Sequence, residues 1–322
     1  WAYECRPETG AAYCPGEDYI RQVKEVGETA VCTWGLSMNG YALQHSKVTK
    51  RDPELGDKDP LADIKRWVDK YGLRWHVYYT PPHDTYWIQQ HPEWRVLKSP
   101  DEKLDPPGRW QMMCLMSPYG DIVIDKLVEI VREYGVDGFN FDGWNYICPI
   151  CYCVSCKDNY RKAMGADLPP KVDFSDPNYR KYIRWRDQQK IDWAIRMQRA
   201  VKAVKPDVCL MPWWVGPGRW WGMEEGKGFK WEPELVNVIA DFPCLEMFWD
   251  WPLDEGGTIM PDFCMRYITG LRKGRPWCPS PSWGAHGQSG VIPRIEMRFR
   301  VAEIIANGGI PGPNMWWGAA GK

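Results

Sequence analysis

Hydrophobic positions along this chain follow two spacings, one typical of amphipathic helices and one typical of buried strands. The helical spacing ends on a glycine in three segments, 17–27, 59–72 and 121–135. A fourth helical segment runs from about 179 to 204 and stops before Pro206. Short apolar runs follow these segments, so the pattern predicts repeated strand and helix units around a parallel sheet.

Eight short apolar runs are expected to be the strands of this sheet. In chain order they are AVCTWGLS (30–37), LRWHVYYT (73–80), QMMCLMS (111–117), VDGFNFDG (136–143), DVCLMPWW (207–214), FPCLEMFW (242–249), RPWCPSPSW (275–283) and GGIPGPNMWW (308–317). Eight parallel strands alternating with helices close naturally into a (β/α)₈ TIM barrel. We therefore expect residues 1–322 to form a single α/β catalytic domain of this kind, with a long loop at 216–233.

The chain ends at Lys322, a few residues after the eighth run. We expect the eighth helix of the barrel to be missing from this sequence. Either the helix at 17–27 covers that seam, or the natural protein continues beyond Lys322. The open seam and the surplus of tryptophan also suggest a surface for a second copy, as in a homo-oligomer.

Composition narrows the classes of partner. Lys and Arg number 41 against 42 Asp and Glu, and the net charge of −1 creates no long-range field for nucleic acid or anionic lipid. No apolar run reaches the roughly 18 residues of a membrane span. We expect a soluble protein without nucleic-acid or membrane partners. Its compartment stays open, although a zinc–thiolate site would slightly favour the cytoplasm.

Chemistry in such barrels takes place at the carboxyl ends of the strands. The carboxylates at predicted strand ends are Asp84, Asp142, Glu246 and Asp250. The aromatic residues at the same ends are Trp34, Tyr79, Trp144, Trp213, Trp249, Trp283 and Trp316. The chain has 21 Trp and 16 Tyr, more than a core accommodates, so some should line a cleft. Flat apolar faces around a few carboxylates suit a carbohydrate.

Glycoside hydrolysis requires two carboxyl groups beside the bond that breaks, and Asp142 and Glu246 are the candidate pair. Strand alternation sends Asn140 and Asp142 the same way, toward the barrel axis or its mouth. The alternative for Asp142 is a cap of a helix or turn. Glu246 lies in the apolar run CLEMFW, where a charge is costly without a partner or a function. Asp250 replaces Glu246 if Glu246 points outward.

Two histidines are candidates for binding substrate hydroxyl groups. His45 and His83 lie in the loops expected after the first and second strands. The alternative for both is an ordinary surface histidine.

Four cysteines occur close together, at Cys148, Cys151, Cys153 and Cys156. Thiolates at such spacing in a tight loop can reach one tetrahedral Zn²⁺. Cys151 and Cys153 are too close for an easy mutual disulfide, so the spacing favours zinc over disulfides or free thiols. Four thiolates leave no open coordination position, and the metal would therefore brace the loop after Asp142 without taking part in catalysis.

The spacing from Asp142 to the C-Y-C-x-x-C segment resembles that in the zinc-bearing β-galactosidases of glycoside hydrolase family forty-two. This resemblance implies that the fourth zinc ligand comes from upstream, on the side of the third strand, and that Cys148 is left over. The ligand set that it implies is Cys114, Cys151, Cys153 and Cys156.

Three further motifs resemble glycoside hydrolases related to α-L-fucosidases: HPEW (91–94), CLMSPY (114–119) and YGVDGFNFD (134–142). This resemblance covers roughly residues 17–250 and implies that Asp142 is a nucleophile. In family forty-two this strand ends on an acid/base Glu preceded by Asn, whereas Phe141 precedes Asp142, so that role does not transfer. The resemblance implies a retaining glycosidase, fucosidase- or galactosidase-like, with Glu246 as acid/base.

Two other classes of function fit the same residues. One is a carbohydrate-binding barrel without catalysis that uses the Trp-lined cleft. The other is a thiol or metal-redox protein built around the cysteine loop.

Overall fold

The computed structural model describes residues 16–36, 40–102, 112–142, 149–215, 237–241, 244–246, 266, 269–270, 277–281 and 294–314. Their strands form one parallel sheet of seven strands, whose spatial order follows the order along the chain. The strands are β1 (Ala30–Trp34), β2 (Arg74–Tyr79), β3 (Gly138–Phe141), β4 (Cys209–Val215), β5 (Cys244–Glu246), β6 (Trp277–Pro281) and β7 (Ile310–Asn314). The α/β class and the parallel sheet predicted from the sequence are confirmed.

Helices connect these strands. They are α1 (Glu17–Glu25), α2 (Pro60–Tyr71), α3 (Thr85–Gln90), α4 (Tyr119–Tyr134), α5 (Val154–Met164), α6 (Pro177–Val204) and α9 (Arg294–Ala306), with 3₁₀ turns η1 (Pro53–Leu55) and η2 (Pro92–Trp94). The expected end signals act as predicted, because the Asp59 carboxylate caps α2 and Gly72 and Gly135 end helices at φ 61°. Among the described residues, no helix is both long and apolar enough to cross a membrane.

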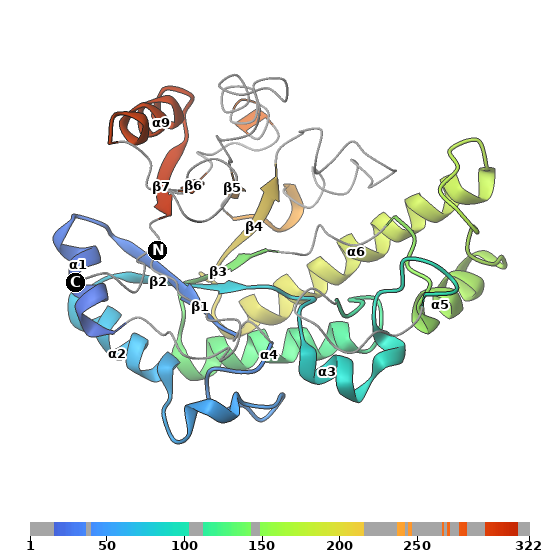
Figure 1. The fold of residues 1–322 in the computed structure, drawn as a ribbon, viewed down its shortest axis with the longest axis horizontal. Helices are drawn as coiled ribbons and strands as arrows, with labels where there is room; N and C mark the ends of the chain where they lie inside the picture. Colours follow the sequence, from blue (N-terminus) through green and yellow to red (C-terminus); the bar gives the residue numbers. More distant parts are fainter. Residues whose placement is uncertain are drawn as a thin grey trace.

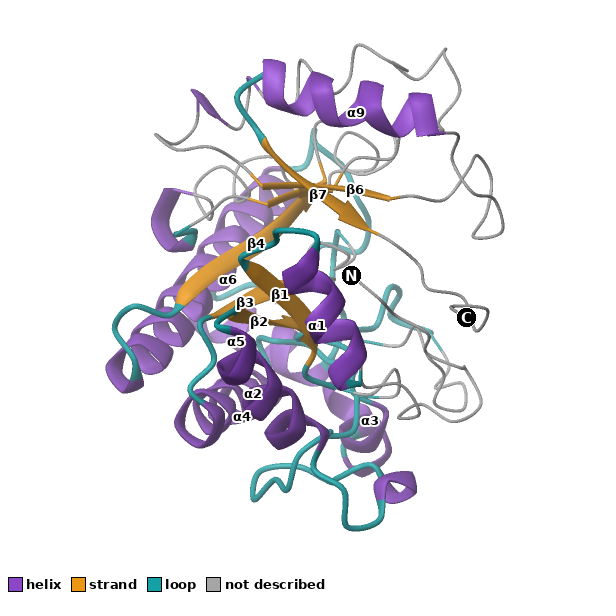
Figure 2. Ribbon diagram, turned by 90° about the vertical axis from the view of Figure 1, so that its left-hand side faces the viewer, coloured by secondary structure: helices purple, strands orange, loops and turns teal. Residues whose placement is uncertain are grey.

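Helices α2 and α4 lie on one side of strands β1–β3, and α9 lies beside β7 at the other end of the sheet (Figures 1 and 2). One face of these strands is buried under the helices. Val77 and Phe139 from this face, together with Leu210 of β4, belong to the same core cluster as Leu127 of α4 and Met197 of α6. Burial of this apolar surface is the main contribution that holds the helix layer on the sheet.

The opposite face of the sheet carries a mixed set of aromatic, polar and apolar side chains. Strand pairing places Trp34, Tyr78, Asn140 and Met211 in one row across β1 to β4. Because side chains alternate along a strand, residues in this row point away from the helix-covered core. This difference between the two faces is the arrangement expected of the outside and inside of a curved parallel sheet.

The predicted third strand, 111–117, is wrong in its described part. Met113 makes only an isolated antiparallel bridge with Arg95, and β2 pairs directly with β3. The Met113 N–H donates to the Pro82 carbonyl and the Cys114 N–H donates to the Trp94 carbonyl, each at 2.8 Å. Carbonyl groups in the segment between β2 and α4 therefore accept the hydrogen bonds that a neighbouring strand would otherwise accept. An apolar run alone does not distinguish a buried loop from a buried strand.

Candidate functional site

Asp142 is the first residue after β3, at the carboxyl end of the strand. Its backbone N–H donates to the Tyr79 carbonyl at 3.0 Å, which continues the pairing of β3 with β2. Its half-buried carboxylate accepts a hydrogen bond from the Tyr78 hydroxyl through Oδ2. The ring of Tyr78 packs on Trp34 with centroids 4.6 Å apart and a tilt of 50°. Three adjacent strands thus bring a carboxylate, a phenol and an indole together.

Asp142 is not the cap of the next described helix, since the N-cap of α5 is Cys153. Its neighbour on the same face of β3 is Asn140, which is fully buried. Neither polar atom of this amide has a nitrogen or oxygen partner among the described residues. Burial raises the pKa of the Cys32 thiol beside it, and a weak hydrogen bond with the amide opposes that shift.

Tyr78 is the tyrosine that contacts the candidate carboxylate, whereas the sequence pattern pointed to Tyr79. Tyr79 has no exposed surface and lies in the helix-covered core, with its ring edge on Phe139 at a centroid distance of 6.4 Å. The strict alternation of side chains along β2, together with the register that pairs Tyr78 with Asn140, is the signal that distinguishes the two tyrosines.

The two predicted histidines lie in different environments. His45 is exposed, and its loop is held on α4 because the Ser46 hydroxyl and the Lys47 N–H both donate to the Glu129 carboxylate, at 2.6 and 2.7 Å. No described contact joins His45 to Asp142. His83 is buried in the turn between β2 and α3, where its N–H donates to the Thr80 carbonyl at 3.2 Å.

Asp84, the fourth carboxylate at a predicted strand end, has a structural role. It caps α3, where Oδ1 accepts from the Trp87 N–H at 3.0 Å. Oδ2 pairs with the Lys126 ammonium of α4 and accepts from the Tyr119 hydroxyl at 3.2 Å. Both members of the ion pair are buried, so this contact ties the loop after β2 to α4.

Other predicted residues are described in part or not at all. Glu246 ends β5 with its backbone paired to Val215, and Trp213 of β4 is paired to Cys244, but the described part does not include their side chains. Predicted residues outside the described ranges are Trp144, Cys148, Trp249, Asp250, Trp283, Trp316 and the loop 216–233.

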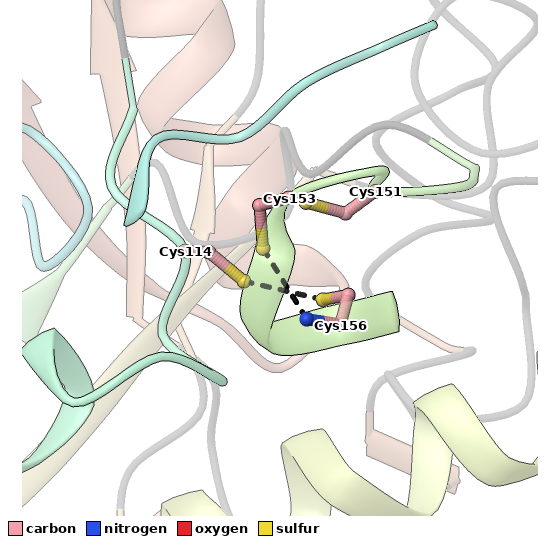
Figure 3. A group of neighbouring side chains, drawn as sticks. All are labelled: Cys114, Cys151, Cys153 and Cys156. Atoms are coloured by element: carbon pink, nitrogen blue, oxygen red, sulfur yellow. Dashed lines mark hydrogen bonds between the residues drawn. The ribbon is translucent and has the colours of Figure 1, made fainter. Parts of the chain in front are cut away.

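Four cysteine thiols from two segments of the chain meet in one cluster (Figure 3). The Sγ atoms of Cys114, Cys151, Cys153 and Cys156 all lie within 4.8 Å of one another, and all four residues are buried. Sγ of Cys114 and Sγ of Cys156 are 3.5 Å apart, and the Cys156 N–H donates to Cys153 Sγ at 3.4 Å. The six cysteines whose side chains the structure describes form no disulfide. This is the set that the resemblance implied, with Cys114 contributed from upstream.

The four thiols fit a tetrahedral thiophilic ion. Zinc–sulfur bonds of about 2.3 Å place the sulfurs of a tetrahedral site about 3.8 Å apart, and the observed set needs only small side-chain adjustments to reach this spacing. Hydrogen bonds with the neighbouring thiols and burial raise the pKa of Cys114 and Cys156. A divalent cation would supply the positive charge that four buried thiolates require.

Further contacts fix the segment that carries these cysteines. The Tyr152 N–H donates to the Leu97 carbonyl at 2.9 Å, and the Cys151 N–H donates to the Tyr182 hydroxyl of α6 at 3.2 Å. Arg186 of α6 donates to the Pro149 carbonyl. These contacts therefore anchor residues 149–152 to α6 and to Leu97.

Comparison with known families gives one match. Residues 15–143 match the family model described as Hypothetical glycosyl hydrolase 6. The match covers less than half of the chain and ends one residue after Asp142. A search of curated proteins by sequence found no match.

Several solved structures have a similar fold. The α-L-fucosidase isoenzyme 2 from Paenibacillus thiaminolyticus has a TM-score of 0.71 at 19% identity, over 98% of this chain and 44% of that enzyme. The β-galactosidase from the haloarchaeon Halorubrum lacusprofundi has a TM-score of 0.71 at 13% identity, over 98% and 52%. The PgaB (BpsB) glycoside hydrolase domain from Bordetella bronchiseptica has a TM-score of 0.66 at 13% identity, over 92% and 86%. The chain spans about half the length of the first two, and it shares its fold with these glycosidases.

Proposed function

We propose that the protein is a glycoside hydrolase and that Asp142 lies in its active site. The observation that carries this proposal is the half-buried Asp142 carboxylate at the carboxyl end of β3, bonded to Tyr78 beside the Trp34 ring. An aromatic face next to a carboxylate suits a sugar, whose C–H face stacks while its hydroxyls bond to polar groups. The family match and the shared fold support the same class.

We propose further that the sheet closes into a (β/α)₈-like barrel in which 111–117 contributes no strand. The parallel order of β1 to β7 supports this closure, as does the contrast between the apolar face under the helices and the mixed row of Trp34, Tyr78, Asn140 and Met211. In such a barrel Asp142 lies at the face where catalytic residues gather.

The proposed second carboxyl group is Glu246. β3 and β5 are two strands apart, about 10 Å across the sheet. By register Glu246 lies two residues further along than Asp142, which is about 7 Å. The two Cα atoms are then roughly 12 Å apart, a separation across which two carboxyl side chains can flank one sugar.

The proposed reaction retains the anomeric configuration, as the fucosidase resemblance implies. Asp142 attacks the anomeric carbon while protonated Glu246 gives its proton to the leaving oxygen. The Glu246 carboxylate then takes a proton from water, which attacks the same carbon and releases Asp142. A separation of about 5–5.5 Å between the two carboxyl groups fits a retaining reaction, whereas a separation of about 6.5–9.5 Å fits an inverting one.

Cys114, Cys151, Cys153 and Cys156 are the proposed ligands of one structural zinc ion. When bound, the ion supplies the charge that holds the four thiolates together, and it has no coordination position left for substrate. Its effect on activity would be indirect, because the segment from residue 149 follows the Asp142 loop. Stoichiometric zinc after exhaustive dialysis, with no redox metal, would support this role and remove the metal-redox alternative.

The test of the function is hydrolysis of a panel of nitrophenyl glycosides, beginning with α-L-fucosides and β-D-galactosides. Asp142→Asn should lower kcat at least about a thousandfold and retain sugar binding. The matched control is Asp167→Asn, an exposed aspartate paired with Arg161, which should keep full activity. A protein that binds sugars but hydrolyses none, with Asp142→Asn unchanged in binding, would instead be a carbohydrate-binding barrel.

A further inference from the structure

We propose that Tyr78 is a positioning residue that holds the Asp142 carboxylate ionised and in one orientation. This inference rests on the proposed glycosidase function for its catalytic consequence. Its geometric basis is the hydrogen bond from the Tyr78 hydroxyl to Oδ2 of Asp142.

The surroundings of Tyr78 keep its hydroxyl in place. Tyr78 lies inside β2, where its backbone is paired with Trp34 on one side and Asn140 on the other. Its ring packs on Trp34 with a centroid distance of 4.6 Å. Strand pairing fixes the backbone of Tyr78, and the contact with Trp34 restricts its ring. The hydroxyl therefore has little freedom to move away from the Asp142 carboxylate.

A phenol in this position affects a nucleophile in two ways. A donor to a carboxylate stabilises the charged form, which is the form that attacks. The same bond restricts rotation of the carboxyl group and keeps it aligned with the sugar. Tyr78 itself forms no bond to the substrate in this role.

The test compares Tyr78→Phe with a matched control, Tyr134→Phe. Phenylalanine keeps the ring on Trp34 and removes only the hydroxyl. The Tyr134 hydroxyl also donates to an aspartate, Asp59 Oδ2 at 2.7 Å, but at the junction of α2 and α4. Both variants remove one Tyr–Asp hydrogen bond, so a general loss of stability would appear in both thermal unfolding midpoints.

The first readout does not depend on turnover. Carboxyl carbons of aspartate are labelled with ¹³C, and the Asp142 resonance is assigned by its loss in Asp142→Asn. The titration midpoint of this resonance should rise by roughly one pH unit in Tyr78→Phe and stay unchanged in Tyr134→Phe. An unchanged midpoint in Tyr78→Phe would overturn the inference whatever the activity.

The second readout uses the nitrophenyl glycoside that the wild-type protein hydrolyses. Tyr78→Phe should lower kcat roughly ten- to a hundredfold, leave KM within about threefold and move the acid limb of the pH profile upward. An unchanged kcat would also overturn the role. If the titration midpoint rises in Tyr78→Phe but the wild-type protein hydrolyses no glycoside, the proposed function fails while Tyr78 still holds Asp142.

Discussion

Lys126→Met is expected to destabilise the fold strongly, because it breaks an ion pair that lies entirely inside the molecule. The side chains of Lys126 and Asp84 have 1% and 0% of their surface exposed. After the substitution the Asp84 carboxylate keeps its bonds to Trp87 and Tyr119 but loses its counter-charge. Breaking one partner of such a pair costs about 3–5 kcal/mol.

The assay is equilibrium unfolding in urea, with Lys65→Met as the control. Lys65 also pairs with an aspartate, Asp69, but these side chains are 35% and 62% exposed. The control should therefore lose less than about 1 kcal/mol. The double variant Lys126→Met/Asp84→Asn removes the isolated charge and should recover most of the loss. Equal losses in Lys126→Met and Lys65→Met would refute the reasoning.

Two further substitutions test other parts of the fold. Cys153→Ser should lose the bound zinc and lower the thermal midpoint, whereas Cys209→Ser, outside the cluster, should retain zinc in the same metal analysis; zinc retained in both would contradict the ligand set. His76 tests the pH dependence of unfolding, since burial lowers its pKa from 6.5 to about 4. As pH falls, His76 is therefore protonated in the unfolded chain before it is protonated in the folded protein. The free energy of unfolding decreases between about pH 6.5 and about pH 4, by about 3 kcal/mol in total. Between pH 7 and pH 4.5, His76→Phe should lose about 2 kcal/mol less stability than the wild type in urea unfolding, whereas exposed His45→Phe should match the wild type.

Features with local causes could be predicted from the sequence. Asp59, Gly72 and Gly135 mark helix ends through their own conformational and capping preferences, and these ends appear where expected. The position of Asp142 at the end of a strand could also be predicted, because the strand-like run before it is a local property of the sequence. The structure places it at that strand end.

Features that depend on distant pairing could not be predicted in the same way. The run 111–117 has strand-like composition, but Pro82 and Trp94, which lie outside the sheet, accept the backbone hydrogen bonds of Met113 and Cys114. The choice between Tyr78 and Tyr79 requires the register of β2 with β3. Spacing alone could not select Cys114 as a companion of the later cysteines, because only the fold brings it to them.

The central claim is that Asp142 attacks the sugar, and trapping of the covalent intermediate tests it most directly. The protein is incubated with 2-deoxy-2-fluoro glycosyl fluorides of the fuco and galacto series, digested and analysed by mass spectrometry. One sugar attached to Asp142, and none in Asp142→Asn, is the predicted result. Attachment to another carboxylate, or inversion of configuration in the product of a natural glycoside, would contradict it.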